Sequence, residues 1–239
     1  MAHRGRLNTL ANVVRKPMEV IMAELQGITP STAKDETLAS GDVKYHLGTT
    51  FRRTYGESGT EIKLTLMANP SHLEAVNPCV GGRARAEQHF VGGDKESRKQ
   101  VIPIVVHGDA AFAGQGIVYE CLQMEKLPNY DVGGTIHLVI NNQVGFTTTP
   151  DRARSTVYCS DVATAINAPI FHVNAQSMDD VARVFRIAAE YRQKFQSDVV
   201  VDLIGYRKMG HNELDQPMFT QPLMYQIVQK MNPVRNVYR

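Results

Sequence analysis

The sequence predicts an α/β protein whose doubly wound, mainly parallel sheet carries helices on both faces. Three short runs rich in β-branched residues, at 101–106, 135–140 and 199–204, are separated by helix-length segments. Such runs, without alternation of polar and apolar residues, are typical of strands buried on both faces of a parallel sheet. At 239 residues the chain can bury a sizeable core. The repeated strand–helix pattern favours one domain over two.

Composition excludes several classes of protein. The net charge is +2, from 26 basic and 24 acidic residues that are scattered along the chain, so no nucleic-acid partner is expected. No apolar run approaches the ~20 residues that span a bilayer, and we expect a soluble protein with no membrane span. Cys79, Cys121 and Cys159 lie far apart and lack metal-ligand spacing. They indicate passive thiols in a reducing compartment.

The first third of the chain predicts helix, loop and strand in that order. Between residues 7 and 25 apolar residues recur three or four apart, which predicts an amphipathic helix with a break or a fresh first turn at Pro17. Residues 27–41 form a polar loop long enough to be functional. Polar and apolar residues alternate over 61–68, which predicts a strand.

Ser71 and Glu74 have the spacing of a capping box, so a helix is predicted to begin at Ser71. The free N–H groups of a helix start can also bind phosphate, and the two interpretations are compatible. Further along, small residues after Asp109 lead into a helix that continues to Leu127 and stops at Pro128.

Residues 171–173 predict a short strand. Ser177 and Asp180 then cap an amphipathic helix that extends at least to Tyr191.

Oxygen-bearing side chains follow two of the predicted strands. Asp109 comes shortly after the strand at 101–106, and Asn142 comes after the strand at 135–140. Ligands of open α/β sheets bind outside the carboxyl ends of the strands. Mg²⁺ takes a few protein oxygens and completes its shell from phosphate and water. Either residue alone is more often a cap or a turn, but together they predict a site for Mg²⁺ and a diphosphate.

This pattern resembles the thiamine-diphosphate motif, in which Gly-Asp-x is followed one crossover later by Asn-Asn. Ala110 stands where that motif usually has a third-position glycine. Six segments, in family order, resemble the family of 2-oxoglutarate dehydrogenase E1 components: residues 3–8, 41–46, 69–74, 107–116, 141–148 and 210–213.

The resemblance implies that residues 1–239 form the diphosphate-side domain of the thiamine-diphosphate-binding fold, as a single domain. It implies that Asp109 and Asn142 ligate Mg²⁺ through side-chain oxygens and Val144 through its backbone carbonyl. The other implied contacts with thiamine diphosphate are Arg4, Ser71, Leu73, Ala110 and Ala111.

By the same resemblance, His46 and His3 face the 2-oxo acid, where they stabilise the developing oxyanion or relay protons. His211 is expected near the same crevice. A structural, hydrogen-bonding role is the default for a lone histidine, and it is the one expected for His72, His89, His137 and His172.

The implied activity is oxidative decarboxylation of 2-oxoglutarate with transfer of the succinyl group to the lipoyl domain of the E2 succinyltransferase. The family implies a homodimer in the mitochondrial matrix of a eukaryote, or in the cytoplasm of a bacterium. The related 2-oxoadipate enzyme is an alternative, although Lys44 and Tyr45 before His46 favour 2-oxoglutarate. A non-catalytic truncated domain is a second alternative. A nicotinamide-binding oxidoreductase is disfavoured because Gly114-Gln115-Gly116 lacks the third glycine of that motif.

Both ends of the sequence stop without closing a structural element, so we expect a piece of a longer polypeptide. In the resembling family, the carboxylate that protonates the aminopyrimidine comes from a later domain across a dimer interface. This chain offers no candidate for it. The expectation is therefore a half-site that cannot turn over alone.

Overall fold

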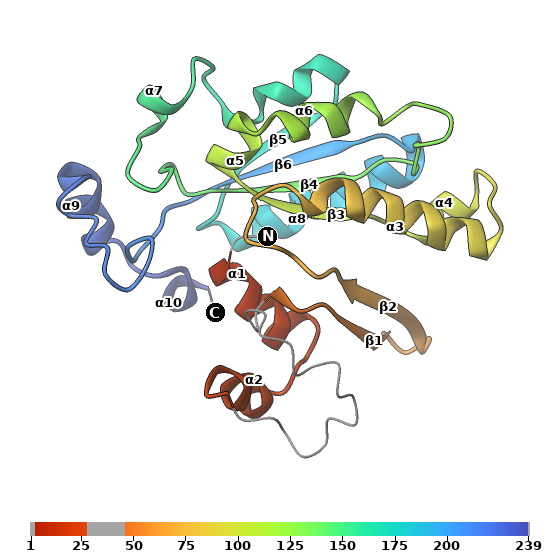
Figure 1. The fold of residues 1–239 in the computed structure, drawn as a ribbon, viewed down its shortest axis with the longest axis horizontal. Coiled ribbons are helices and arrows are strands. Elements are labelled where there is room, and N and C mark those ends of the chain that lie inside the picture. Colours follow the sequence, from red (N-terminus) through yellow and green to blue (C-terminus); the bar gives the residue numbers. More distant parts are fainter. Residues whose placement is uncertain (1–2, 28–45, 239) are drawn as a thin grey trace. The chain divides into compact units, whose positions relative to one another are not determined.

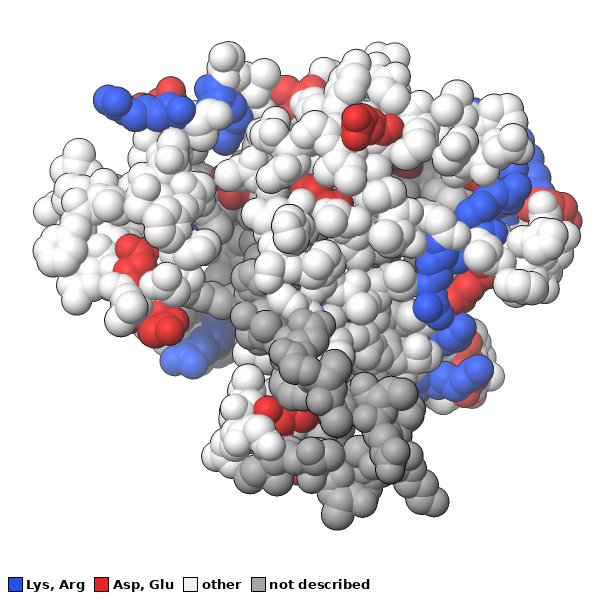
Figure 2. Space-filling view, in the orientation of Figure 1, with Lys and Arg blue, Asp and Glu red and all other residues white. Residues whose placement is uncertain are grey.

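The computed structural model describes residues 3–27 and 46–238. The chain forms two compact units, residues 1–76 and 77–239 (Figure 1). On the face that Figure 2 shows, basic and acidic side chains are interspersed, in keeping with the small net charge. None of the helices described is long and apolar enough to cross a membrane.

The first unit begins with three helical segments. Helix α1 (His3–Asn8) continues into the π-helical turn η1 (Thr9–Val13), and α2 (Met18–Leu25) follows. Pro17 has φ −56° and ψ 136°, which is extended backbone, so the predicted helix is confirmed with its break at this residue. The predicted loop at 27–41 falls, apart from Gly27, outside the described residues.

A β-hairpin completes the first unit. Strand β1 (Thr49–Tyr55) pairs antiparallel with β2 (Thr60–Leu66). Gly56 and Gly59 in the turn have φ +62° and +67°, a region that glycine enters without strain. The sequence predicted β2 but missed β1, although β1 is rich in threonine and aromatic residues. A small core joins hairpin and helices: Leu10, Val14, Ile21, Phe51, Leu64 and Leu66.

The predicted helix start at Ser71 is wrong. Helix α3 (Val76–Val91) begins five residues later, and residues 71–75 form bends and turns. Glu74 has φ +69°, a left-handed conformation that a right-handed helix cannot contain. Ser71 is therefore a loop residue whose side chain remains available for other contacts.

The second unit is built on a four-stranded parallel sheet of order β3-β4-β6-β5. The strands are β3 (Ile104–Gly108), β4 (Ile136–Asn141), β5 (Ile170–Asn174) and β6 (Val199–Ile204). All three pairings are parallel. The strands predicted from the buried apolar runs are thus confirmed, and their carboxyl ends lie at one edge of the sheet.

Helices cover both faces of this sheet, which confirms the doubly wound fold (Figure 1). On one face lie α5 (Asp109–Gly114), α6 (Gly116–Gln123) and the 3₁₀ segment η4 (Cys159–Ile166). Helix α8 (Met178–Phe195) covers the other face. Neighbouring residues of β6 alternate accordingly: Val200 packs in the first core and Val199 and Val201 in the second.

One predicted helix boundary and one predicted cap need correction. Helix α6 ends at Gln123 and does not reach Leu127, because the backbone tightens into successive turns in which the N–H of Met124 bonds to the carbonyl of Cys121. Helix α8 does begin after Ser177, but the Ser177 hydroxyl donates to Asp180 Oδ2 at 2.6 Å and caps no backbone N–H. The remaining helices are α4 (Ser97–Gln100), α7 (Pro150–Ala153), α9 (Pro222–Lys230) and α10 (Val234–Val237).

Arg192, on α8, ties the segments that precede β3 and β4. Its fully buried guanidinium donates to the carbonyls of Gly134 at 2.9 Å, Val132 at 2.8 Å and Val101 at 3.2 Å. Burial lowers the pKa of Arg192 to about 10. Gln88, on α3, donates to the same Val101 and Val132 carbonyls at 3.0 and 2.8 Å. Helices α3 and α8 thereby fix the amino ends of β3 and β4, at the end of the sheet opposite the candidate site.

Candidate functional site

Asp109 is the first residue of α5, directly after β3, and only 3% of it is exposed. Burial raises the pKa of its carboxyl group. Hydrogen bonds from the backbone N–H groups of Asp109, Ala110 and Asn142, and the positive charge of Arg154, oppose this shift. The parallel register that pairs Gly108 with Ile140 places Asp109 and Asn142 just beyond the ends of neighbouring strands.

The loop after β4 is a tight structure held by its own side chains. Asn142 Oδ1 accepts the backbone N–H of Val144 at 3.1 Å. Gln143 and Phe146 have φ +61° and +54°, so the chain turns sharply twice within the loop. Val144 is 3% exposed, and its side chain points into the protein. An amide oxygen has a second lone pair, so Asn142 Oδ1 can still face a cation.

This loop rests on the first turn of α5. A Cβ atom built on Gly145 would lie 2.9 Å from the Ala110 Cβ. That is closer than carbon atoms pack, so only glycine fits here without a shift. Ala110 itself is exposed, and Ala111 is buried. The methyl group of Ala110, where the thiamine motif usually has glycine, is thus accommodated by the absence of a side chain at Gly145.

Replacing Gly145 by alanine should push this loop away from α5. We expect the affinity for Mg²⁺ and thiamine diphosphate to fall about 10-fold or more, as for other changes that displace metal ligands. The measurement is calorimetric titration of the cofactor in the presence of Mg²⁺. Gly114→Ala is the matched control, because nothing lies within 4 Å of a Cβ at Gly114. Equal affinities for the two variants would contradict the packing argument.

The residues present fit a hard cation with a diphosphate. The donor set comprises one carboxylate, one amide oxygen and one backbone carbonyl, which suits Mg²⁺ when phosphate and water complete the shell. Throughout 3–27 and 46–238, no group of three or more His, Cys, Asp or Glu side chains could hold a metal ion. The predicted site differs from such a cluster, because Asp109 is its one residue of those types and the other donors are an amide oxygen and a backbone carbonyl.

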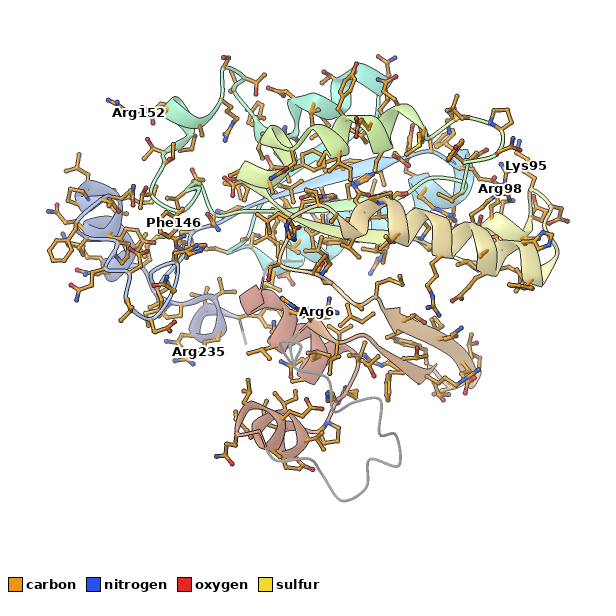
Figure 3. All side chains as sticks on the ribbon, viewed as in Figure 1. Arg6, Lys95, Arg98, Phe146, Arg152 and Arg235 are labelled. Carbon is orange, nitrogen blue, oxygen red and sulfur yellow. The ribbon has the colours of Figure 1, made fainter. Side chains whose placement is uncertain are left out.

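His211 lies beside the loop after β4. Its ring meets the ring of Phe146, which Figure 3 labels, edge-on with centroids 4.5 Å apart. Arg207 Nη2 donates to the Phe146 carbonyl at 2.9 Å, which ties the same two segments. A Cβ on Gly210 would lie 2.0 Å from the Asp215 carbonyl oxygen, so glycine is required next to His211. The structure therefore places His211 beside the loop that carries Asn142 and Val144.

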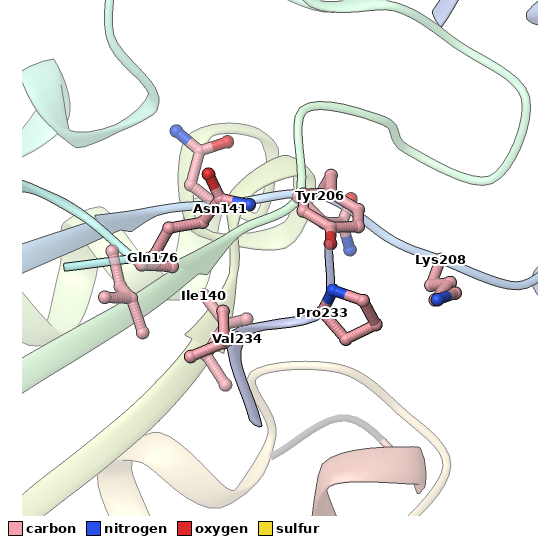
Figure 4. A pocket seen from close by; sticks show the side chains of 11 residues that line it. Ile140, Asn141, Gln176, Tyr206, Lys208, Pro233 and Val234 are labelled. Atoms are coloured by element: carbon pink, nitrogen blue, oxygen red, sulfur yellow. The ribbon is translucent and has the colours of Figure 1, made fainter. Parts of the chain in front are cut away.

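A cavity of about 280 Å³ opens at the carboxyl ends of β4, β5 and β6, beside Asn142 (Figure 4). Gln176, Tyr206 and Lys208 contribute polar groups, whereas the sheet and the C-terminal segment contribute apolar ones. The sequence reasoning missed these three residues. Gln176 follows β5, and Tyr206 and Lys208 follow β6, so the strand-end rule that found Asp109 could have found them too.

In the first unit, the structure brings His46 and Ser71 together. Ser71 Oγ lies 3.3 Å from His46 Nε2, and His46 is buried. Arg6, which the sequence reasoning missed, holds this arrangement (Figure 3). Its buried guanidinium donates to the carbonyls of His46 at 3.4 Å, Leu47 at 2.9 Å and Met67. Burial lowers the pKa of Arg6.

For the other predicted site residues of this unit, the structure gives the position in the fold. Leu73 lies in the turn before α3 and is 49% exposed. His3 and Arg4 belong to α1, the helix that also carries Arg6. Residues 41–45 of the motif that ends at His46 fall outside the described part of the chain.

Comparison with known proteins identifies the family. The model of the family described as dehydrogenase E1 component matches residues 1–239. The chain belongs to this family. Over 238 residues it is 54% identical to a protein of Dictyostelium discoideum and 55% identical to one of Saccharomyces cerevisiae, both named 2-oxoglutarate dehydrogenase, mitochondrial. A Rattus norvegicus protein named 2-oxoglutarate dehydrogenase-like, mitochondrial, is 55% identical. This E1-family chain is covered completely in each case and spans 23% of each relative's length.

Cys159 lies beneath the site of this E1-family chain and is 1% exposed. Burial raises the pKa of its thiol to about 12, and the carboxylates of Asp202 and Asp109 act in the same direction. The thiol is therefore protonated at neutral pH. It can donate a hydrogen bond but cannot act as a nucleophile.

The raised pKa predicts a loss of stability in alkali. The protonated thiol stabilises the fold fully below the unfolded-state pKa near 9.0, and this contribution disappears as the pH rises toward the folded-state pKa of about 12. Denaturant unfolding from pH 7 to 10.5 should show the wild-type chain losing stability relative to Cys159→Ser above pH 9. Cys79→Ser is the control because Cys79 is exposed. A constant difference between wild type and Cys159→Ser would contradict the assignment.

Proposed function

We propose that this chain supplies the Mg²⁺–diphosphate half of a thiamine-diphosphate site in an enzyme that oxidatively decarboxylates 2-oxoglutarate. The observation that carries this proposal is the placement of the buried Asp109 carboxyl group and of Asn142 just beyond the ends of two paired strands, in a chain of the dehydrogenase E1 family. A carboxyl group whose charged form is disfavoured by burial is typical of a functional site.

Each site residue has a distinct role in this proposal. Asp109 and Asn142 hold Mg²⁺ through side-chain oxygens, and Val144 holds it through its carbonyl. Ala110 and Ala111 line the diphosphate, because their small side chains let the backbone approach it. Arg4, Ser71 and Leu73 make the remaining contacts with the cofactor, with Arg4 as a cation near the phosphates.

When bound, thiamine diphosphate would supply the electron sink for the electron pair that departing carbon dioxide leaves on the substrate carbon. The protein's own part is to place and stabilise charge. His46, with His3, faces the 2-oxo acid and donates a hydrogen bond where negative charge develops on its keto oxygen. The Ser71 contact and the Arg6 bonds hold His46 in one position for this task. His211 acts from the side of the loop after β4.

The names of the relatives support the substrate and the location, and the family resemblance of the sequence motifs supports the partner and the homodimer. We propose 2-oxoglutarate as substrate, transfer of a succinyl group to the lipoyl domain of an E2 succinyltransferase, a homodimeric parent protein and a mitochondrial location. The 2-oxoadipate enzyme and a non-catalytic domain are the alternatives. The carboxylate that activates the aminopyrimidine is proposed to come from a part of the protein outside this sequence.

A chimera tests the substrate and the activity together. This chain would replace the corresponding 238 residues of the Saccharomyces cerevisiae relative, which is 55% identical. Carbon dioxide release would be measured with 2-oxoglutarate and with 2-oxoadipate, and an Asp109→Asn chimera is the matched control. The proposal predicts release that prefers 2-oxoglutarate and needs Asp109. A preference for 2-oxoadipate would favour the alternative substrate, and a folded but inactive chimera would favour the non-catalytic domain.

The chain alone should bind cofactor without sustaining turnover, because it holds one half of the site. Sustained release of carbon dioxide from 2-oxoglutarate by the purified 239-residue chain would overturn the half-site proposal.

A further inference from the structure

A chain of polar contacts, buried from Asp202 onward, crosses the sheet and ends at the loop after β4. It begins at His172 on β5, whose Nδ1 lies 2.9 Å from Asp202 Oδ2 on β6. The other Asp202 oxygen, Oδ1, accepts the Cys159 thiol at 3.7 Å, and the Cys159 sulfur accepts Asn141 Nδ2 at 3.4 Å. Asp202, Cys159 and Asn141 are 0%, 1% and 4% exposed, so water does not compete for these contacts.

The chemistry of the groups sets the direction of every bond in this chain. A carboxylate can only accept hydrogen bonds, so Asp202 Oδ1 orients the thiol hydrogen of Cys159 toward itself. The sulfur lone pairs then face Asn141, and the Asn141 amide must present its nitrogen to them. The Asn141 oxygen is thereby turned to the backbone N–H of Gln143, which it accepts at 3.1 Å.

The Asn141 side chain shapes the first turn of the loop. The Gln143 N–H that it accepts belongs to a residue with φ +61°, which favours asparagine or glycine, so the turn relies on this contact. Gln143 Nε2 and the Asn141 carbonyl both bond to the backbone of Gly205 at 2.8 Å. Asn142 and Val144, which carry the proposed Mg²⁺ ligands, follow within this turn.

We propose that Asp202 is a positioning residue which, through the Cys159 thiol, fixes the Asn141 amide and so the loop that carries the Mg²⁺ ligands. The expected effect on cofactor binding rests on the proposed function, whereas the contacts among Asp202, Cys159 and Asn141 are independent of it. The three side chains are no hydrolytic triad, because His172 contacts one carboxylate oxygen and Cys159 contacts the other.

The test compares Asp202→Asn with the wild-type 239-residue chain. The new amide keeps the shape of Asp202. When its N–H₂ group faces Cys159, the sulfur meets two N–H₂ donors, one from position 202 and one from Asn141. The orientation of the Asn141 amide is then no longer fixed. With selective asparagine labelling, NMR should show the Asn141 side-chain amide signals shifted or broadened without any cofactor. Calorimetry with thiamine diphosphate and Mg²⁺ should show binding about 10- to 100-fold weaker, as for other residues that support metal ligands.

Asp198→Asn is the matched control. Asp198 is also a buried carboxylate, its Oδ2 lies 3.2 Å from His137 Nε2, and it precedes β6 at the opposite end of the strand. The Asp198→Asn variant should lose stability, while its Asn141 signals and its cofactor affinity stay at wild-type values. Cys159→Ala should reproduce the effect of Asp202→Asn, and Cys159→Ser, which keeps a donor and an acceptor, should bind cofactor more tightly than Cys159→Ala.

Unmoved Asn141 signals together with wild-type cofactor affinity in folded Asp202→Asn would overturn the inference. Should Asp202→Asn fail to fold, the same comparison between Cys159→Ala and Cys159→Ser decides it. Should the wild-type chain bind no cofactor, the proposed function fails, and the Asn141 signals alone decide whether Asp202 positions this loop.

Discussion

Asp109→Asn is expected to stabilise the cofactor-free chain and to abolish its binding of Mg²⁺ and thiamine diphosphate. Burial raises the pKa of the Asp109 carboxyl group, so the folded state disfavours its charged form. The resulting cost is absent below the unfolded-state pKa near 3.8 and develops as the pH rises through the higher folded-state pKa. Asparagine removes that cost at neutral pH and keeps the shape of the side chain.

The loss of function in this variant should be large. Asp109 is a proposed direct ligand of Mg²⁺, so its loss should weaken cofactor binding by more than the ~10- to 100-fold typical of residues that support metal ligands. With Mg²⁺ present and thiamine diphosphate at 100 times its wild-type Kd, ligand should stabilise the wild-type chain by about 2.7 kcal/mol and the variant by almost nothing. Urea unfolding between pH 4 and 7, with and without ligand, measures both effects. Asp151→Asn is the control, because the Asp151 side chain is 74% exposed. A variant less stable than wild type at pH 7 would contradict this account of Asp109.

Arg192→Met is expected to lower the free energy of unfolding by about 2 to 4 kcal/mol. The change leaves the buried Gly134 carbonyl without its donor and weakens the bonding of Val101 and Val132, which keep Gln88. Relief of the desolvation that lowers the pKa of Arg192 to about 10 offsets part of this cost. Urea unfolding at pH 7 measures the difference.

Arg183→Met provides the comparison on the same helix. The Arg183 side chain is 72% exposed and pairs with the exposed Asp180, so its loss should change stability by less than about 0.5 kcal/mol. Equal losses for the two arginine variants would show that the bonds at the amino ends of the strands contribute little.

The parallel sheet was predictable because its strands are buried on both faces and stand out as apolar runs. The strand-end positions of the proposed Mg²⁺ ligands were predictable for a related reason. Asp109 and Asn142 follow neighbouring strands, and parallel pairing brings Gly108 level with Ile140, so the following residues must meet at one edge. In such a sheet, position in the sequence determines position in space.

Other features depend on contacts that the sequence order does not reveal. The capping-box spacing at Ser71 was misleading because Glu74 adopts a left-handed conformation, which ends any helix there. Arg6 bonds to carbonyls 40 and 61 residues away, and Asp202 reaches Asn141 through Cys159, which is 43 residues from Asp202. Each of these side chains holds residues of its own unit in place, and no local motif marks them.

The most direct measurement is calorimetric titration of the wild-type chain with thiamine diphosphate, with and without Mg²⁺. The account predicts saturable binding that requires Mg²⁺, because Asp109, Asn142 and Val144 reach the diphosphate through the metal. Binding of equal strength without Mg²⁺, or no binding by a chain that circular dichroism shows to be folded, would contradict a preformed Mg²⁺–diphosphate half-site.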